Sequence, residues 1–134
     1  MRNTYKSMAL SILMSVVSKT LTETMETTIL QSFPWDFANS TEFYRKLKRM
    51  FASIVVTHRK EVYKTLCSDD FIRKYPVMKK VLKLPVSDLK KSIIFLSGIG
   101  CTTQEISHIL QCEKRSVSTM RSTCKKHISN IFKH

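Results

Sequence analysis

Apolar side chains recur at steps of three and four residues along two long stretches of this chain, and this spacing constrains the fold more than any other feature. One stretch covers residues 5–30 and the other residues 40–66. A period near 3.6 residues puts such side chains on one face of an α-helix. Helix breakers are scarce as well, because the 134 residues include only 2 Gly and 3 Pro. We therefore predict an all-α protein.

The second stretch predicts a helix that begins at Asn39 or Ser40 and runs to about Leu66. His58 lies in its apolar stripe, and we interpret it as a core or boundary histidine because nothing nearby supports catalysis. The first stretch, residues 5–30, predicts an amphipathic helix that either packs within the monomer or forms a homodimer contact. Its stripe consists of Leu10, Leu13, Met14, Val17, Leu21, Met25 and Ile29.

Two short helical pieces are predicted between residue 69 and Pro85, and a different pattern begins after that proline. We therefore divide the chain into a helical N-terminal region, residues 1–84, and a C-terminal bundle of three or four helices, residues 85–134. In this bundle Ser87 and Asp88 predict a helix start, and Gly98 and Gly100 predict the end of that helix.

The next segment contains the pattern of a helix-turn-helix. Thr102 and Glu105 have the spacing of a capping box, in which each side chain bonds the other residue's backbone N–H. A short helix ending near Gln111, a turn over residues 112–115 and a third helix over about residues 115–130 follow. A short helix, a tight turn and a longer polar and basic helix make the shape that enters a DNA major groove.

The order of these residues resembles the LuxR-type helix-turn-helix family, in the variant found at the C-termini of many Bacteroidetes regulators. The resemblance covers roughly residues 86–128 and implies DNA binding, commonly by dimers on inverted half-sites. Lys90, Glu113 and His127 depart from the family pattern. The matching positions are Val86, Ser87, Gly100, Thr102, Glu105, Ile106, Leu110, Ser116, Val117, Cys124 and Ile128.

The candidate contacts divide by chemistry into two groups. Short side chains early in the third helix suit base edges, whereas cations and the hydroxyls of the preceding helix start suit phosphates. The predicted base-facing residues are Arg115, Ser116, Ser118, Thr119 and Ser122. The predicted phosphate-binding residues are Thr102, Thr103, Lys114, Arg121, Lys125 and Lys126.

The chain contains 23 Lys and Arg but only 10 Asp and Glu, which gives a net charge of +13. Such an excess of positive charge favours a polyanionic partner. Residues 1–70 carry +3 and residues 71–134 carry +10, and no acidic side chain follows Glu113. We expect a sequence-specific regulator of transcription that binds double-stranded DNA in the cytoplasm. Two alternatives stay open: a helical protein-interaction adaptor that does not bind DNA, and a basic membrane-surface protein.

No motif predicts an enzyme. The sequence has no Gly-rich phosphate loop, no H-E-x-x-H and no G-x-S-x-G, and its acidic residues are scattered. The spacing of Cys67, Cys101, Cys112 and Cys124 fits no zinc pattern, so we expect buried reduced thiols. We therefore expect neither a metal, a cofactor nor a small-molecule substrate.

Overall fold

The computed structural model describes residues 6–16, 18–19, 23 and 40–132, and all regular structure in this part of the chain is helical. The all-α prediction is confirmed, and no described helix is long and apolar enough to cross a membrane. Residues 6–16 form an N-terminal helical segment. The helices that follow are α2 (Ser40–Leu66), α3 (Asp69–Lys74), α4 (Met78–Leu82), α5 (Asp88–Gly98), α6 (Thr103–Leu110), α7 (Lys114–Thr123) and α8 (Lys125–Ile131).

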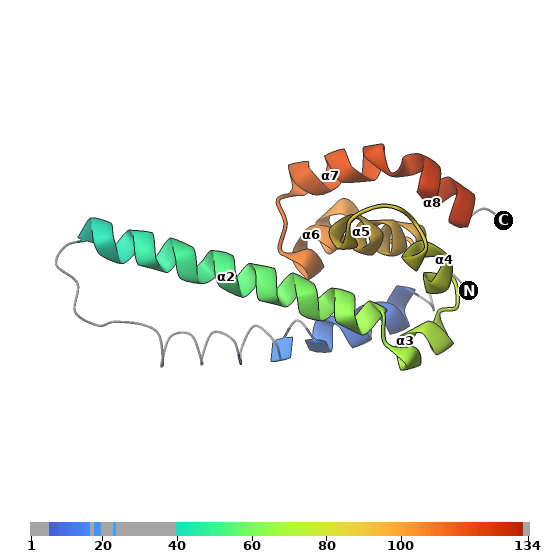
Figure 1. Cartoon of the computed structure of the whole chain (residues 1–134), viewed down its shortest axis with the longest axis horizontal. Helices are drawn as coiled ribbons and strands as arrows, with labels where there is room; N and C mark the ends of the chain where they lie inside the picture. Colours follow the sequence, from blue (N-terminus) through green and yellow to red (C-terminus); the bar gives the residue numbers. More distant parts are fainter. Residues whose placement is uncertain (1–5, 17, 20–22, 24–39, 133–134) are drawn as a thin grey trace.

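Helix α5 is the centre of the fold. It contacts α2, α4, α6, α7 and α8, and in Figure 1 α7 and α8 lie above it while the N-terminal segment lies below. Its five consecutive residues from Ser92 to Leu96 are all buried. Five consecutive residues point in every direction around a helix, so this part of α5 must be covered on all sides. The buried Ser92 hydroxyl has a hydrogen-bond partner, because it donates to the Asp88 carbonyl of the preceding turn at 3.0 Å.

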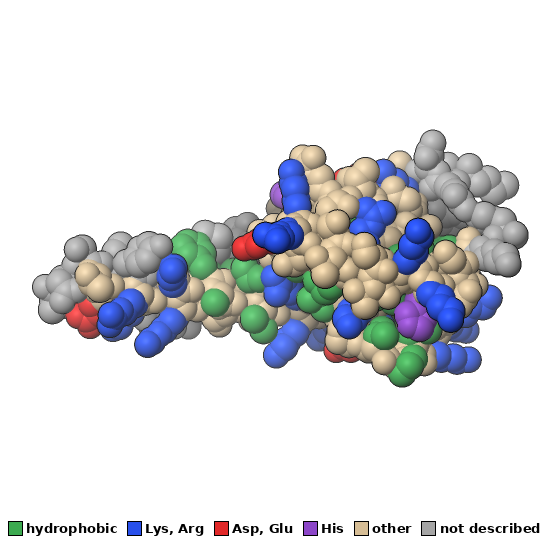
Figure 2. Space-filling model, turned by 90° about the horizontal axis from the view of Figure 1, so that it is seen from above, with side chains coloured by type: hydrophobic (Ala, Val, Ile, Leu, Met, Phe, Trp, Pro, Cys, Tyr) green, Lys and Arg blue, Asp and Glu red, His purple; other side chains and the backbone are tan. Residues whose placement is uncertain are grey.

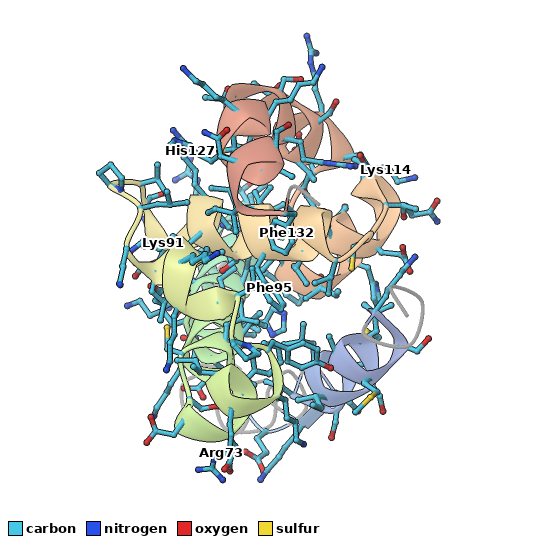
Figure 3. The ribbon with its side chains drawn as sticks, turned by 90° about the vertical axis from the view of Figure 1, so that its right-hand side faces the viewer. Arg73, Lys91, Phe95, Lys114, His127 and Phe132 are labelled. Carbon is cyan, nitrogen blue, oxygen red and sulfur yellow. The ribbon has the colours of Figure 1, made fainter. Side chains whose placement is uncertain are left out.

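An aromatic cluster joins α5 to its neighbours. The ring of Phe95 lies 5.4 Å from Phe71 and 5.9 Å from Tyr75, both at edge-to-face angles. Phe132, just after α8, lies 6.4 Å from Phe95 on another side, and Figure 3 shows it between α8 and Phe95. These contacts fix α3 and the chain end after α8 to the same buried ring.

Helix α2 has 27 residues, and its described buried side chains all lie in the second half. Its buried residues follow at steps of four, namely Ile54, His58, Val62 and Leu66. The first half extends away from helices α3 to α8 (Figure 1). The predicted helix over these residues, and the buried position of His58, are both confirmed.

The N-terminal segment packs within the chain. Ala9 and Leu13 are fully buried in the same hydrophobic core as α5, and Leu10 packs against that core, whereas Met14 is exposed. For the described part of the stripe, packing within the monomer is therefore what the structure shows. Val17, Leu21, Met25 and Ile29 lie outside the described residues, and the homodimer contact stays a prediction. The division after residue 84 also stays a prediction, although one core takes side chains from both sides of it.

The glycines after α5 act in different ways. Gly100 has φ 99° and supplies the left-handed turn that the sequence predicts for the helix end. Gly98, in contrast, is the last residue of α5, so it lies at the predicted helix end but does not supply the left-handed turn. Its lack of a side chain makes room for Phe132, because a Cβ at this position would lie 2.1 Å from the ring.

The prediction of one continuous third helix over about residues 115–130 was wrong. The structure has two helices, α7 and α8, divided at Cys124, and α7 begins at Lys114, one residue before the expected start. Cys124 has φ −95° and ψ 4°, outside the helical range. The division changes the direction of the chain so that α8 packs on α5 and Phe132 reaches Gly98. No glycine or proline marks this break in the sequence.

We predict that Gly98→Ala lowers the free energy of unfolding by about 1–3 kcal/mol, because the new methyl group must displace the Phe132 ring. Urea denaturation of the wild type, both single variants and the Gly98→Ala/Phe132→Ala double variant measures this. In the Phe132→Ala background the same substitution should be neutral or stabilising, since alanine favours a helix by up to about 1 kcal/mol over glycine. An equal loss in both backgrounds would contradict the contact.

Candidate nucleic-acid interface

The start of α6 is built by a reciprocal pair of hydrogen bonds. The hydroxyl of Thr102 accepts from the Glu105 backbone N–H at 3.1 Å, and the Glu105 carboxylate accepts from the Thr102 N–H at 2.8 Å. The predicted capping box is therefore confirmed. The same carboxylate oxygen pairs with the Lys6 ammonium at 2.9 Å, which attaches the N-terminal segment to this helix start.

These partners shift the titration of Glu105. The backbone N–H of Thr102 and the Lys6 side chain both stabilise the ionised carboxylate, so the pKa of Glu105 falls below its ordinary value of 4.5. The hydrogen bond to Glu105 in turn raises the pKa of Lys6. The charged state of this pair is therefore favoured by the folded chain at neutral pH.

The C-terminal end of α6 is held by α2. The Nε2–H of His58 donates to the Ile109 carbonyl at 2.6 Å. The guanidinium of Arg59 donates to the carbonyls of Leu110 at 2.9 Å and Gln111 at 2.7 Å. The last carbonyls of a helix have no partner within it and carry partial negative charge, so they favour donors and cations. We call these contacts the α6 clamp.

The α6 clamp fixes the turn of the helix-turn-helix. Gln111 caps α6 in the left-handed conformation, with φ 53° and ψ 49°, without being a glycine. The Ser107 hydroxyl donates to the Cys112 carbonyl on the other side of the turn. Glu113 then precedes α7 as its N-cap but makes no side-chain cap hydrogen bond. Helix α7 is therefore positioned by its packing on α5 and α6 and by the turn after α6, without a side-chain cap of its own.

Helix α7 presents a polar face outward. Val117 and Cys124 are buried on its inner side, as the sequence predicts, while Met120 is half-buried. In Figure 2, which looks onto α7 and α8, Lys and Arg side chains are spread over this face. The predicted contact residues that are exposed are Thr102, Lys114, Arg115, Ser116, Ser118, Thr119, Ser122, Lys125 and Lys126.

Five of the predicted contact residues meet in one groove of about 350 Å³ between α7, α8 and the start of α6. There the Arg121 guanidinium donates to the Thr103 hydroxyl at 2.7 Å, so the two helices are joined at the groove. The Ser97 hydroxyl, from α5, is buried at the same groove and has no hydrogen-bond partner among the described residues. The five residues are Thr103, Ser118, Arg121, Ser122 and Lys125.

The groove has the chemistry of an anion site. Arg121 and Lys125 supply positive charge, and the serine and threonine hydroxyls can donate to an oxygen. The predicted contacts outside the groove, among them Arg115 and Lys126, lie on the exposed part of α7, α8 and the α6 start. The structure thus separates the predicted residues into a groove set and an outer set.

The hydroxyls of α7 differ in what they can offer to a ligand. Thr119 donates its hydroxyl proton to the Arg115 carbonyl at 3.0 Å, so only its methyl group and oxygen lone pairs face outward. Within the part of the chain that the structure describes, the hydroxyls of Ser118 and Ser122 make no hydrogen bond and can both donate and accept. The two serines can therefore donate a hydrogen bond to a ligand, which Thr119 cannot do while it donates to the Arg115 carbonyl.

The cysteines do not form a metal site among the described residues. All four are free thiols, with Cys101 and Cys124 buried and the other two half-buried. No group of three or more His, Cys, Asp or Glu side chains in this part of the chain could hold a metal ion. Burial raises the pKa of Cys101 to about 11 and also raises the pKa of Cys112 and of Cys124, so these thiols stay protonated at neutral pH.

Sequence reasoning missed Arg59 and Lys6, which hold the two ends of α6. For Arg59 a signal exists in hindsight, because the residue after α6 is Gln111 and no glycine follows it. A helix that ends without glycine needs donors from elsewhere for its last carbonyls. The position of Lys6 opposite Glu105 depends on the packing of the N-terminal segment and has no comparable signal.

No protein-family model, curated protein or solved structure matches this chain. The resemblance of residues 86–128 to the LuxR-type family therefore stays a prediction.

We predict that Arg59→Ala lowers the free energy of unfolding by about 2 kcal/mol, because two charge-assisted hydrogen bonds to α6 carbonyls are lost. Chemical denaturation measures the change. Arg59→Lys should recover only part of it, since an ammonium cannot reproduce the fork of the guanidinium. The exposed neighbour Lys60→Ala is the matched control and should change stability by less than about 0.5 kcal/mol. A loss for Lys60→Ala as large as for Arg59→Ala would contradict the α6 clamp.

We predict that Glu105→Gln destabilises the protein at pH 7 by less than about 1 kcal/mol, since the carboxylate is partly exposed to solvent. Because the folded-state pKa of Glu105 is lowered, its stabilisation is complete above pH 4.5 and disappears as the pH falls through the folded-state value. The difference between wild type and variant should therefore shrink on acidification, as thermal unfolding at several pH values will measure. Glu113→Gln, which removes a carboxylate with no cap hydrogen bond, is the control, and a difference that grows toward low pH would refute the assignment.

Proposed function

We propose that this chain is a transcriptional regulator that binds double-stranded DNA in a sequence-specific manner, with α7 in the major groove. The observation that carries the proposal is the exposed polar and cationic face of α7, held outward by α6 through a fixed turn. A major groove about 12 Å wide admits one α-helix. On this reading Ser118 and Ser122 face the bases, whereas Arg121 and Lys125 of the same groove hold a backbone phosphate.

Charge favours this proposal. The segment from Lys114 to residue 134 contains Lys and Arg but no Asp or Glu. Each cation that neutralises a phosphate releases a counterion, which gives affinity that falls with salt concentration. Glu113, the last acidic residue, lies before α7, where a carboxylate favours the helix dipole but repels a phosphate. We expect the DNA backbone to pass this position at a distance.

The roles of individual residues follow from the hydrogen bonds. Arg121, whose guanidinium is oriented by Thr103, is proposed to bind a phosphate oxygen together with Lys125. Ser118 and Ser122 are proposed to read base edges, because their hydroxyls are exposed at the same groove. A homodimer on inverted half-sites is part of the proposal, and its contact through residues 5–30 would use side chains other than the buried Leu13.

The experiment that tests the proposal is selection of bound fragments from a random duplex library, followed by a mobility shift with the recovered duplex. Enrichment of a common sequence, and its binding in preference to unrelated duplex, would support it. Absence of duplex binding at any salt concentration would sink it and favour the adaptor. Sedimentation with anionic vesicles in the absence of duplex binding would favour the membrane-surface protein.

We predict that Lys125→Ala/Lys126→Ala weakens binding to all duplexes by a similar factor and lowers the salt slope, d log K/d log [salt], by about 2. Ser118→Ala should instead change the preferred base at one position, by about 1–3 kcal/mol. Fluorescence anisotropy across a salt series measures both. Lys79→Ala/Lys80→Ala removes the same charge from exposed positions on α4 and is the control. If that control lowers the slope equally, the phosphate assignment is wrong.

A further inference from the structure

We propose that one exposed side of α2 is a second DNA contact, which extends the α7 interface along the duplex that flanks the recognised site. This surface consists of Arg45, Arg49 and Lys60, and we call it the α2 stripe. The inference rests on the proposed DNA binding and assigns to it a surface outside the helix-turn-helix.

The α2 stripe lies on one side of a helix. Its members follow at intervals of four and eleven residues, close to one and three helical turns, so they point in similar directions. All three side chains are exposed. The rise of about 1.5 Å per residue places Arg45 and Lys60 about 22 Å apart along the helix axis. The stripe is therefore a long and narrow row of positive charge.

The stripe begins beside the turn that leads into α7. Lys60 and Val56 line a groove of about 430 Å³ together with Leu110, the last residue of α6. The neighbouring Arg59 holds the carbonyl of Gln111, and α7 starts three residues later. The view onto α7 and α8 also shows Lys and Arg side chains along α2 toward its start at Ser40 (Figure 2). A duplex seated on α7 thus has cations of α2 on the same face of the protein.

The composition of α2 suits a polyanion. This helix carries seven Lys or Arg and only two Glu, one of them in its first turn. Before Ile54, none of the α2 side chains that the structure describes is buried. A row of cations on a projecting helix is suited to backbone phosphates, which carry no sequence information but add affinity.

A membrane and a second copy of the chain fit this surface less well. Membrane-surface helices need one continuous apolar face. The apolar side of α2 includes His58 and packs on the core, and Arg49 is nine residues from His58, about 180° around the helix. The α2 stripe therefore lies opposite the apolar side of this helix. A second α2 laid along the first would bring like charges together, which is unfavourable.

The test compares two duplexes with the full chain. The first is the minimal site recovered by library selection, and the second is that site extended by about 10 base pairs, one helical turn, at each end. The wild type should bind the longer duplex more tightly and with a steeper salt slope. The Arg45→Gln/Arg49→Gln/Lys60→Gln variant should bind the minimal site like the wild type but lose the gain from the flanks, with the slope on the longer duplex reduced by up to about 3.

The matched control is Lys79→Gln/Lys80→Gln/Lys83→Gln, which removes the same charge from exposed positions in and just after α4. In Figure 1 α4 lies far from the start of α2. It should keep the gain from the flanks, and both variants should unfold at the wild-type temperature. Equal binding of the longer duplex by wild type and stripe variant would overturn the inference while leaving the proposed function intact. The inference would also be overturned if the control variant lost the gain from the flanks to the same extent. It would be overturned as well if the stripe variant lost only its sedimentation with phosphatidylserine vesicles and kept its duplex binding. Failure of the wild type to bind the minimal site would instead sink the proposed function.

Discussion

The five consecutive side chains of α5 from Ser92 to Leu96 are all buried, so this part of the helix must be shielded from water on every side. The arrangement of the other helices follows from that requirement. Four of them are large and apolar, and their burial contributes about 6–12 kcal/mol as an upper bound, comparable with the whole stability of a domain. One neighbouring helix could cover only one side. Helices α2, α4, α6, α7 and α8 all contact α5, and the N-terminal segment joins the same core.

The candidate interface depends on how the ends of α6 are held. At its start the Glu105 carboxylate serves both the cap and Lys6, and at its C-terminal end the α6 clamp satisfies carbonyls that no glycine turn serves. Both ends are therefore held by segments distant in sequence. This arrangement gives α7 a fixed direction although its own N-cap contributes no side-chain hydrogen bond. The proposed recognition helix is oriented by the N-terminal region as much as by its own motif.

Local patterns predicted most helices because they depend on neighbouring residues. The apolar spacing of residues 40–66 predicted α2, and the spacing of Thr102 and Glu105 predicted the capping box, since both form within a few turns of helix. The break at Cys124 could not be predicted this way. It accompanies the packing of α8 on α5, where Gly98 leaves space for Phe132. A glycine that makes room for a distant ring looks the same in a sequence as one that ends a helix.

For the candidate interface, the sequence by itself determined which chemistry is present: hydroxyls and cations, with no carboxylate after Glu113. Composition and helical spacing are properties of the chain, so they can be read without coordinates. Only the tertiary structure decided that Arg121 meets Thr103 in a groove and that Arg59 reaches the end of α6, because these contacts join residues 18 and 51 or 52 positions apart. Contacts at such separations are set by the packing of whole helices around α5, which no local pattern encodes.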